Sequence, residues 1–406
     1  MSMSTVLSAK KAFRILFLCS GKITEAEIMA AFQQLNQEVT PFDLNKYRIG
    51  PNSVETLSQD LIKKKNEIDF IFMLNGDAFD GDGKMAERLI EHKIPVVSWE
   101  VDHPFVLDVF GKRKLIPSPY LTLFCWDEGY MDDFRERGFH AVHYLPNATS
   151  AEHFAPDCHE SPTLSRYQSR VQDQITFVGC SYLKFVQSLM PKDSQWDLFP
   201  TKAHMSILND IVNALLQETQ STFKQIFAKL NRDYRLTFEN AEKEEQYLAL
   251  SECMVSSRYR IEMLKRLDKL LVYGDKEEWQ HDLNENRLMG PVSYAQETKY
   301  VFRYSNININ IASAKNRLDS NVRLYDVPMA GGFLLTDAKK NIGQQFELDR
   351  EVIVYHNPDE LQEKIARYKT DDAEKQKIVE QAQSRIMNEH LYRHRIETML
   401  STLVSY

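Results

Sequence analysis

Residues 316–337 read NRLDSNVRLYDVPMAGGFLLTD and hold the most informative group of polar and glycine residues in the chain. This stretch predicts a polar loop, a short helix, a glycine pair and a strand that ends at Thr336-Asp337. Arg323 stands near the predicted helix start, where a cation and free backbone N–H groups can hold a diphosphate. Asp326 follows on nearly the same helical face and can accept hydrogen bonds from ribose hydroxyls. Gly331-Gly332 allows close approach of a ligand or a neighbouring strand.

Taken alone, the same stretch is also compatible with an ordinary helix-to-strand connection. Its surroundings favour an α/β domain, because several apolar runs without polar alternation precede and follow it. Such runs, separated by helical patterns, are typical of buried parallel strands. They predict a second α/β half over residues 174–372, with strands at residues 175–179, 270–274, 307–311, 332–336 and 352–355.

The first part of the chain shows the same pattern. Helical stretches that begin at Thr24 and Met85 alternate with apolar runs at residues 14–19, 68–74, 94–99, 121–126 and 141–145. This alternation predicts a Rossmann-like, doubly wound half over residues 12–150. Residues 151–173 are polar and contain Pro156 and Pro162, which indicates a linker.

A helical block interrupts the second half. Residues 201–273 contain neither glycine nor proline, and their apolar residues follow helical spacing. We expect a helical insertion over about residues 187–268, whose surface is available to a protein partner. Residues 373–406 are again helical and predict a C-terminal helix that packs back on the first half.

Composition excludes several classes of protein. Only 14 of 406 residues are glycine, about half the usual share of ~7%, which argues against an all-β fold rich in tight turns. The net charge of −8 argues against a nucleic-acid binder. Five scattered cysteines without CxxC spacing predict free thiols and no zinc site. No signal peptide or membrane span is visible, so we expect a cytoplasmic protein, with peripheral membrane contact left open.

Polar residues that follow the strands of the first half are the candidates for chemistry there. Gly21 and Lys22 follow the first strand, in a turn that is neither a Walker A loop nor a GxGxxG motif. Glu100, Asp102 and His103 follow the third predicted apolar run, residues 94–99, and a carboxylate or imidazole there can deprotonate a hydroxyl. The alternative is a loop in which Asp102 caps a helix.

The stretch Asp80-Gly81-Asp82-Gly83 has the DxD spacing of metal-dependent sugar transferases. It lacks the further acids of a calcium-binding loop, so a solvated turn is favoured and no metal site is assigned.

Two motifs resemble a known family. The block Arg323…Tyr325-Asp326-x-Pro328-x-Ala330-Gly331-Gly332-Phe333-Leu334-Leu335-Thr336-Asp337 resembles the C-terminal signature of CgeB-like glycosyltransferases, spore-maturation-type relatives of the group 1 sugar transferases. Ser98-Trp99-x-x-Asp102-x-Pro104-Phe105 is similar to the N-terminal domain often joined to it. Residues 175–179, Arg260 before residues 271–274, and His394-Arg395 also lie where that family would place them.

The resemblance implies a GT-B fold: two Rossmann-like domains facing a cleft, with a helical insertion and a C-terminal helix that crosses back. It implies metal-independent transfer from a nucleotide sugar, expected to be UDP-linked, to a polysaccharide, lipid-linked or protein acceptor. The implied site residues are Arg323 and Arg260 for the diphosphate, Asp326 for the ribose, Gly331 and Gly332 beside the donor, Gly21, Lys22, Glu100 and Asn147 on the acceptor side, and Asp102 or His103 for the acceptor hydroxyl.

One position departs from the wider group. Asp326 occupies the second acidic position of an ExxxxxxxE motif, but the first position is Leu318, which leaves the stereochemistry open. Two other functions remain: a nucleotide-sugar epimerase of the same fold, and a non-catalytic sugar-binding or scaffold protein. Donor consumption without an acceptor would favour the epimerase, and a partner bound to the helical block without nucleotide binding would favour the scaffold.

Overall fold

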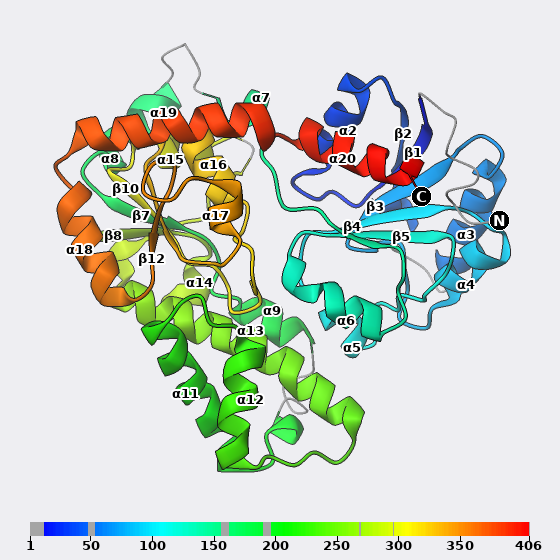
Figure 1. Cartoon of the computed structure of the whole chain (residues 1–406), viewed down its shortest axis with the longest axis horizontal. Coiled ribbons are helices and arrows are strands. Elements are labelled where there is room, and N and C mark those ends of the chain that lie inside the picture. The colour runs from blue at the N-terminus through cyan, green and yellow to red at the C-terminus, as the bar shows by residue number, and fades with distance from the viewer. Residues whose placement is uncertain are drawn as a thin grey trace. The chain divides into compact units, whose positions relative to one another are not determined.

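The chain folds into two compact units, each built around one parallel sheet (Figure 1). The computed structural model describes residues 12–47, 53–155, 162–189, 196–267, 269–294 and 296–405. Unit 1 comprises Met1–Ala148 and Leu391–Tyr406, and unit 2 comprises Thr149–His390. Both sheets have six strands with helices around them, which confirms the predicted α/β class with two Rossmann-like domains.

The sheet of unit 1 has the strand order β2-β1-β3-β4-β5-β6, and all its strands are parallel. The five predicted runs form strands, whose bounds differ from the predicted ones by at most two residues at either end. The sequence did not reveal β2, because it contains Pro41 and is mostly exposed, as is typical of an edge strand. The strands are β1 (Arg14–Cys19), β2 (Glu38–Asp43), β3 (Phe70–Leu74), β4 (Val96–Glu100), β5 (Leu121–Cys125) and β6 (Val142–Tyr144).

Both faces of this sheet are buried, which explains why its inner strands read as continuous apolar runs. Ile15 and Phe17 of β1 point to one face, under α2 and α20, which lie side by side (Figure 1). Leu16 and Leu18 point to the other face, under α3, α4 and α6. The helices of unit 1 are α2 (Glu25–Gln34), α3 (Ser53–Lys64), α4 (Lys84–Glu91), α5 (Val106–Val109), α6 (Met131–Glu136) and α20 (Tyr392–Ser405), with 3₁₀ turns at Leu44–Tyr47 and Glu128–Tyr130.

Arg395 fastens α20 to the end of the unit 1 sheet. Its buried guanidinium donates from Nε to the carbonyl oxygens of Pro146 (2.9 Å) and Asn147 (3.1 Å), and from Nη2 to Asn147 (3.0 Å). We expect Arg395→Ala to lower the free energy of unfolding by about 2 kcal/mol, because it leaves these carbonyls without their charged donor. Denaturant unfolding of this variant against Arg393→Ala, an exposed position on the same helix, measures the loss; equal midpoints for both variants would contradict it.

The sheet of unit 2 has the strand order β12-β11-β10-β7-β8-β9, again all parallel. The five predicted strands are present, and the sixth, β9, is a three-residue edge strand that its sequence does not mark. The strands are β7 (Ile175–Val178), β8 (Leu270–Tyr273), β9 (Leu288–Gly290), β10 (Ile307–Asn310), β11 (Leu334–Asp337) and β12 (Ile353–Tyr355).

The helices of unit 2 include two in the segment expected to be a linker. There α8 packs against α15 and buries Tyr167 and Val171, so most of that segment belongs to the domain; residues 156–161, which include Pro156, lie outside the described residues. The helices are α7 (Ala151–Phe154), α8 (Pro162–Val171), α9 (Leu183–Leu189), α11 (Lys202–Gln217), α12 (Phe223–Tyr234), α13 (Ala241–Lys265), α14 (Lys276–Trp279), α15 (Thr298–Tyr304), α16 (Arg323–Met329), α17 (Ile342–Gln345), α18 (Pro358–Tyr368) and α19 (Asp372–Glu389), with 3₁₀ turns at Trp196–Leu198 and Glu285–Arg287.

The helical part of the glycine-free block lies between β7 and β8 and contains α11, α12 and α13, drawn in green in Figure 1. Helix α11 packs against both of the others. Over its second half, helix α13 is buried on several sides. Its apolar residues therefore do not form a single stripe along the helix.

The expected single helix over 373–406 is wrong, because the chain breaks at His390. The carbonyl oxygen of His390 accepts a hydrogen bond from the Thr149 amide (3.2 Å). The Leu391 amide donates to the ring of His394 (3.1 Å), and a new helix begins there. Helix α19 packs on α16 in unit 2, whereas α20 belongs to unit 1. No helix among the described residues is both long and apolar enough to cross a membrane.

Candidate functional site

In unit 2 the strand order reverses between β7 and β10, which are neighbours in the sheet but distant in sequence. Ligands of open α/β sheets bind at such a point, beyond the carboxyl ends of the strands. Two loops meet there: residues 179–182 after β7 and residues 311–316 after β10.

Arg260 of helix α13 ties these two loops together. Its Nε donates to the Ile311 carbonyl oxygen (3.1 Å) and its Nη1 donates to the Cys180 carbonyl oxygen (2.8 Å). The side chain is buried, and its Cζ lies 4.6 Å from the ring centroid of Tyr182. One cation supplied by the helical block therefore lies at the switch point of the sheet.

Arg323, the first residue of α16, brings a second guanidinium to the same place. Burial, and then the nearby charge of Arg260, lower its pKa. Its Nε is buried and has no hydrogen-bond partner within the part of the chain that the structure describes. A side chain added at Gly179 would lie 3.6 Å from its Nη2, so this guanidinium faces the loop after β7. Two like charges held together in this way favour an anion between or beside them.

Helix α16 has only seven residues, so its dipole adds little and the two guanidiniums carry the positive charge.

The loop after β10 is fixed from two sides. Ser256 of α13 accepts from the Ser313 hydroxyl (2.7 Å) and the Ala314 amide (3.0 Å). On the other side, Asp337 accepts from the Ala312 amide (2.8 Å), and burial raises the pKa of this carboxyl.

Asp326 lies one helical turn after Arg323 and is fully buried. Its Oδ1 accepts from the Thr149 hydroxyl (2.6 Å) and its Oδ2 accepts from the Tyr294 hydroxyl (2.8 Å). Burial raises its pKa to about 7, and these two hydrogen bonds oppose the rise. Both oxygens are engaged within the protein, so the expected direct contact with ribose does not fit this geometry. Asp326 instead holds Tyr294, in the loop between β9 and α15.

Gly331 and Gly332 lie away from the ligand edge. They connect the end of α16 to the start of β11, at the amino edge of the sheet. Gly331 has a φ of +88°, and a side chain at Gly332 would come within 2.3 Å of the Phe302 carbonyl oxygen. The expected role beside the donor is therefore corrected: the pair ends a helix and allows close packing.

Unit 1 has its own switch point, between β1 and β3. The Lys22 ammonium pairs with Asp77 (2.7 Å), which also accepts from the Ser20 hydroxyl (2.5 Å). Gly21 has a φ of +89°, and its amide donates to Glu25 (3.0 Å). The predicted Gly21 and Lys22 therefore lie in a polar loop at the carboxyl edge of this sheet.

Asn75 connects that loop region to Asp102. Its Oδ1 accepts from the backbone amides of Val101 (2.7 Å) and Asp102 (3.2 Å), and its Nδ2 donates to the Asp102 carboxylate (3.0 Å). Asp102 is exposed, so its carboxylate is held in place while open to solvent. The Trp126 indole also donates to the Asp102 carbonyl oxygen (3.0 Å).

The other predicted residues of unit 1 have structural roles. His103 Nδ1 accepts from the amides of Phe105 and Val106 (both 3.2 Å), so His103, rather than Asp102, caps a helix. A buried Glu100 pairs with Arg113 (2.7 Å), and Asn147 presents its carbonyl oxygen to Arg395. Burial disfavours the charge of Arg113, but Glu100 and Asp108 outweigh it and raise its pKa. Both carboxylate oxygens of Glu100 and the Nδ1 atom of His103 are thus engaged within the protein, whereas Asn147 is engaged through its backbone carbonyl.

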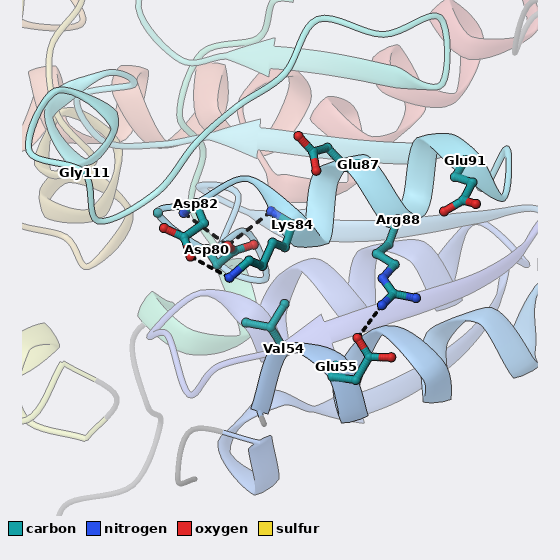
Figure 2. A pocket seen from close by; sticks show the side chains of 10 residues that line it. Val54, Glu55, Asp80, Asp82, Lys84, Glu87, Arg88, Glu91 and Gly111 are labelled. Atoms are coloured by element: carbon teal, nitrogen blue, oxygen red, sulfur yellow. Dashed lines mark hydrogen bonds and ion pairs between the residues drawn. The ribbon is translucent and has the colours of Figure 1, made fainter. Parts of the chain in front are cut away.

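The Asp80–Gly83 loop borders a surface pocket of about 880 Å³ between α3 and α4 (Figure 2). Asp80 accepts from the amides of Asp82 (3.1 Å), Lys84 (3.2 Å) and Met85 (2.7 Å), so it caps α4. The Asp82 carboxylate pairs with Lys84 (2.8 Å). Among the described residues no group of three or more His, Cys, Asp or Glu is arranged to hold a metal ion.

Sequence reasoning missed Asn75, Lys315, Tyr182 and Glu278. Asn75 closes a strand before Gly76, which was a visible signal, and it has a positive φ of 50°. Tyr182 and Lys315 belong to the two loops at the switch point and contact each other only in space, and Glu278 binds the loop after β7 from nearly a hundred residues away. No local spacing marks those three residues.

Comparison with known proteins adds the family context. Residues 258–401 match a family model described as "Glycosyl transferase-like", and a search of curated proteins found no match. The HepE protein of Anabaena, solved with UDP-glucose, is 12% identical, covering 97% of this chain and 100% of that one, with a TM-score of 0.55. Sucrose-phosphate synthase of Thermosynechococcus elongatus is 10% identical over 98% and 100%, with a TM-score of 0.53.

A glycosyltransferase of Rickettsia africae is similar over 98% of both chains, at 10% identity and a TM-score of 0.50. At these identities the likeness concerns the fold, and the family match covers the C-terminal part of the chain. The two parallel six-stranded sheets are thus those of the GT-B glycosyltransferase fold, and residues 258–401 are similar to the glycosyl transferase-like family.

Proposed function

We propose that the protein is a glycosyltransferase that uses a UDP-linked sugar as donor and a hydroxyl of a glycan, lipid-linked sugar or protein side chain as acceptor. The observation that carries this proposal is the pair of guanidiniums, Arg260 and Arg323, at the switch point of unit 2. Burial and the nearby charge of Arg260 disfavour the charge of Arg323 in the free protein, and a diphosphate would relieve this. The HepE complex with UDP-glucose supports the choice of nucleotide.

In this reaction the bond between the anomeric carbon and the diphosphate oxygen breaks, and the acceptor oxygen forms the new bond to that carbon. Negative charge grows on the departing diphosphate, and Arg260 and Arg323 would stabilise it there. We propose metal-independent transfer, because two guanidiniums can carry this charge themselves. Asp102, exposed and oriented by Asn75, is the proposed group for the acceptor hydroxyl proton.

A thermal-shift screen against UDP-, GDP-, CMP- and dTDP-sugars tests the donor proposal. A ligand that binds the folded state at 100 times its Kd stabilises it by about 2.7 kcal/mol, so UDP-sugars are expected to raise the unfolding temperature most. The absence of a shift with every nucleotide would overturn the proposal. Donor turnover measured with and without acceptor then separates transfer from epimerisation.

Cys180 gives an independent readout of the same site. Its thiol is exposed, and its carbonyl oxygen accepts from Arg260. We expect saturating UDP-glucose to slow alkylation of Cys180 by iodoacetamide about 10-fold, because a bound diphosphate would cover this loop. Mass spectrometry of the labelled peptides measures the rate, with the half-buried Cys19 of unit 1 as internal control. Equal protection of both cysteines, or of neither, would contradict a donor bound at this loop.

A further inference from the structure

Tyr182, in the loop after β7, has a φ of +68°. This left-handed conformation is easy for glycine and sterically unfavourable for a tyrosine, whose Cβ crowds the backbone. Non-glycine residues persist in it where the surrounding contacts enforce it, and such residues cluster at functional sites. The contacts around Tyr182 therefore need an explanation.

Glu278 of α14 enforces this conformation from both sides of Tyr182. Its Oε2 accepts from the amide (2.8 Å) and the hydroxyl (3.1 Å) of Ser181, and its Oε1 accepts from the amide of Lys184 (3.3 Å). One residue earlier, Arg260 holds the Cys180 carbonyl oxygen. With its neighbours fixed in this way, the backbone at position 182 has little freedom to relax.

The fixed backbone directs the Tyr182 ring to two cations. The ring centroid lies 4.6 Å from Arg260 Cζ and 4.7 Å from Lys315 Nζ. Arg260 comes from α13 and Lys315 from the loop after β10, so one ring contacts charges from both sides of the switch point. The negative face of an aromatic ring attracts cations at these distances.

We infer that Tyr182 is a positioning residue that holds Arg260 and Lys315 ready for the donor diphosphate. This inference rests on the proposed function. Without the ring between them, these two like charges would repel each other and take up other positions in the free protein. The ring attracts both charges before the anion arrives, so less rearrangement is needed on binding.

The test compares Tyr182→Gly with Tyr182→Phe in the full chain, with UDP as the probe in calorimetric titrations. Glycine removes the ring and accepts the left-handed backbone, so we expect an unfolding temperature equal to or above that of the wild type. The Kd for UDP should rise about 10-fold. Phenylalanine keeps the ring, and its Kd should stay within about 2-fold of the wild type.

Arg235→Gly is the matched backbone control, since Arg235 is exposed at the end of α12 and has a φ of +51°. It should leave UDP binding unchanged. Wild-type affinity in Tyr182→Gly, together with lost binding in Arg323→Ala, would overturn the role of Tyr182 and leave the donor site standing. Wild-type affinity in both variants would instead overturn the donor site. A drop in unfolding temperature for Tyr182→Gly, or weakened binding in Tyr182→Phe, would also count against the inference.

Discussion

Arg323→Ala is expected to weaken UDP binding about 100-fold or more. Charge-assisted hydrogen bonds to phosphate are among the strongest in proteins, and a loss of about 2.7 kcal/mol corresponds to 100-fold in Kd. In the free protein the Arg323 Nε has no partner among the described residues, and burial and then Arg260 lower the pKa of the side chain. This guanidinium is therefore held in an unfavourable place that an anion would make favourable.

The same variant should be as stable as the wild type, or more stable, without ligand, because it removes a poorly solvated charge beside Arg260. Opposite effects on stability and on binding separate a ligand-binding role from a structural one. Arg323→Lys keeps the positive charge but lacks the planar guanidinium with its paired N–H donors, so it should bind UDP with intermediate affinity. Arg258→Ala, a second arginine of α13 that pairs with Asn209, serves as control. Unchanged UDP affinity in Arg323→Ala would remove the main support for the donor site.

Asp326→Asn is expected to change how stability depends on pH. The Asp326 pKa is raised from 3.8 to about 7, chiefly by burial, so the folded state binds this proton more tightly than the unfolded chain does. Stability of the wild type is therefore lost as pH rises from about 4 to about 7, by roughly 4 kcal/mol in all. Roughly 2 kcal/mol of this falls between pH 5 and pH 7, because the carboxyl is still about half protonated at pH 7. Asparagine cannot ionise and removes this component.

Thermal unfolding of both proteins at pH 5, 7 and 8 measures the effect as a difference between two curves. We expect the variant to gain on the wild type as pH rises and the gain to level off above pH 7. Asp233→Asn, at an exposed position of α12, should run parallel to the wild type. Parallel curves for Asp326→Asn as well would mean that the Asp326 carboxyl titrates normally in the folded protein.

The fold was largely predictable because burial on both faces leaves a clear record in the sequence. Most inner strands are largely apolar, as at Phe70–Leu74, whereas β10 (Ile307–Asn310) alternates isoleucine with buried asparagine. The two missed strands are edge strands: β2 contains Pro41, and β9 has three residues. The segment predicted to be a linker, residues 151–173, contains α8. Most side chains of this helix are polar, so the sequence did not show that Tyr167 is buried.

The site was less predictable, because residue type and position do not reveal hydrogen-bond partners. Arg260 and Arg323 come together as the motif suggested, although 63 positions separate them (323 − 260). Glu100, Asp102 and His103 all follow the same strand. Glu100 pairs with Arg113 and His103 accepts from backbone amides at the start of α5, and nothing in the spacing of these residues indicates such partners. The conformation of Tyr182 depends on Glu278, which no pattern near residue 182 could indicate.

Helix α13 combines two roles that a strand-by-strand alignment would separate. Its first half packs with α11, where the Tyr247 hydroxyl donates to the His204 carbonyl oxygen (2.8 Å), while its second half presents Ser256 and Arg260 to the loops after β7 and β10. The family match begins at residue 258, inside this helix. An alignment that discards the block as an insertion would therefore discard Arg260, which we propose to bind the diphosphate, and a shortened variant would have to keep residues 252–265 and the side chains that pack on them.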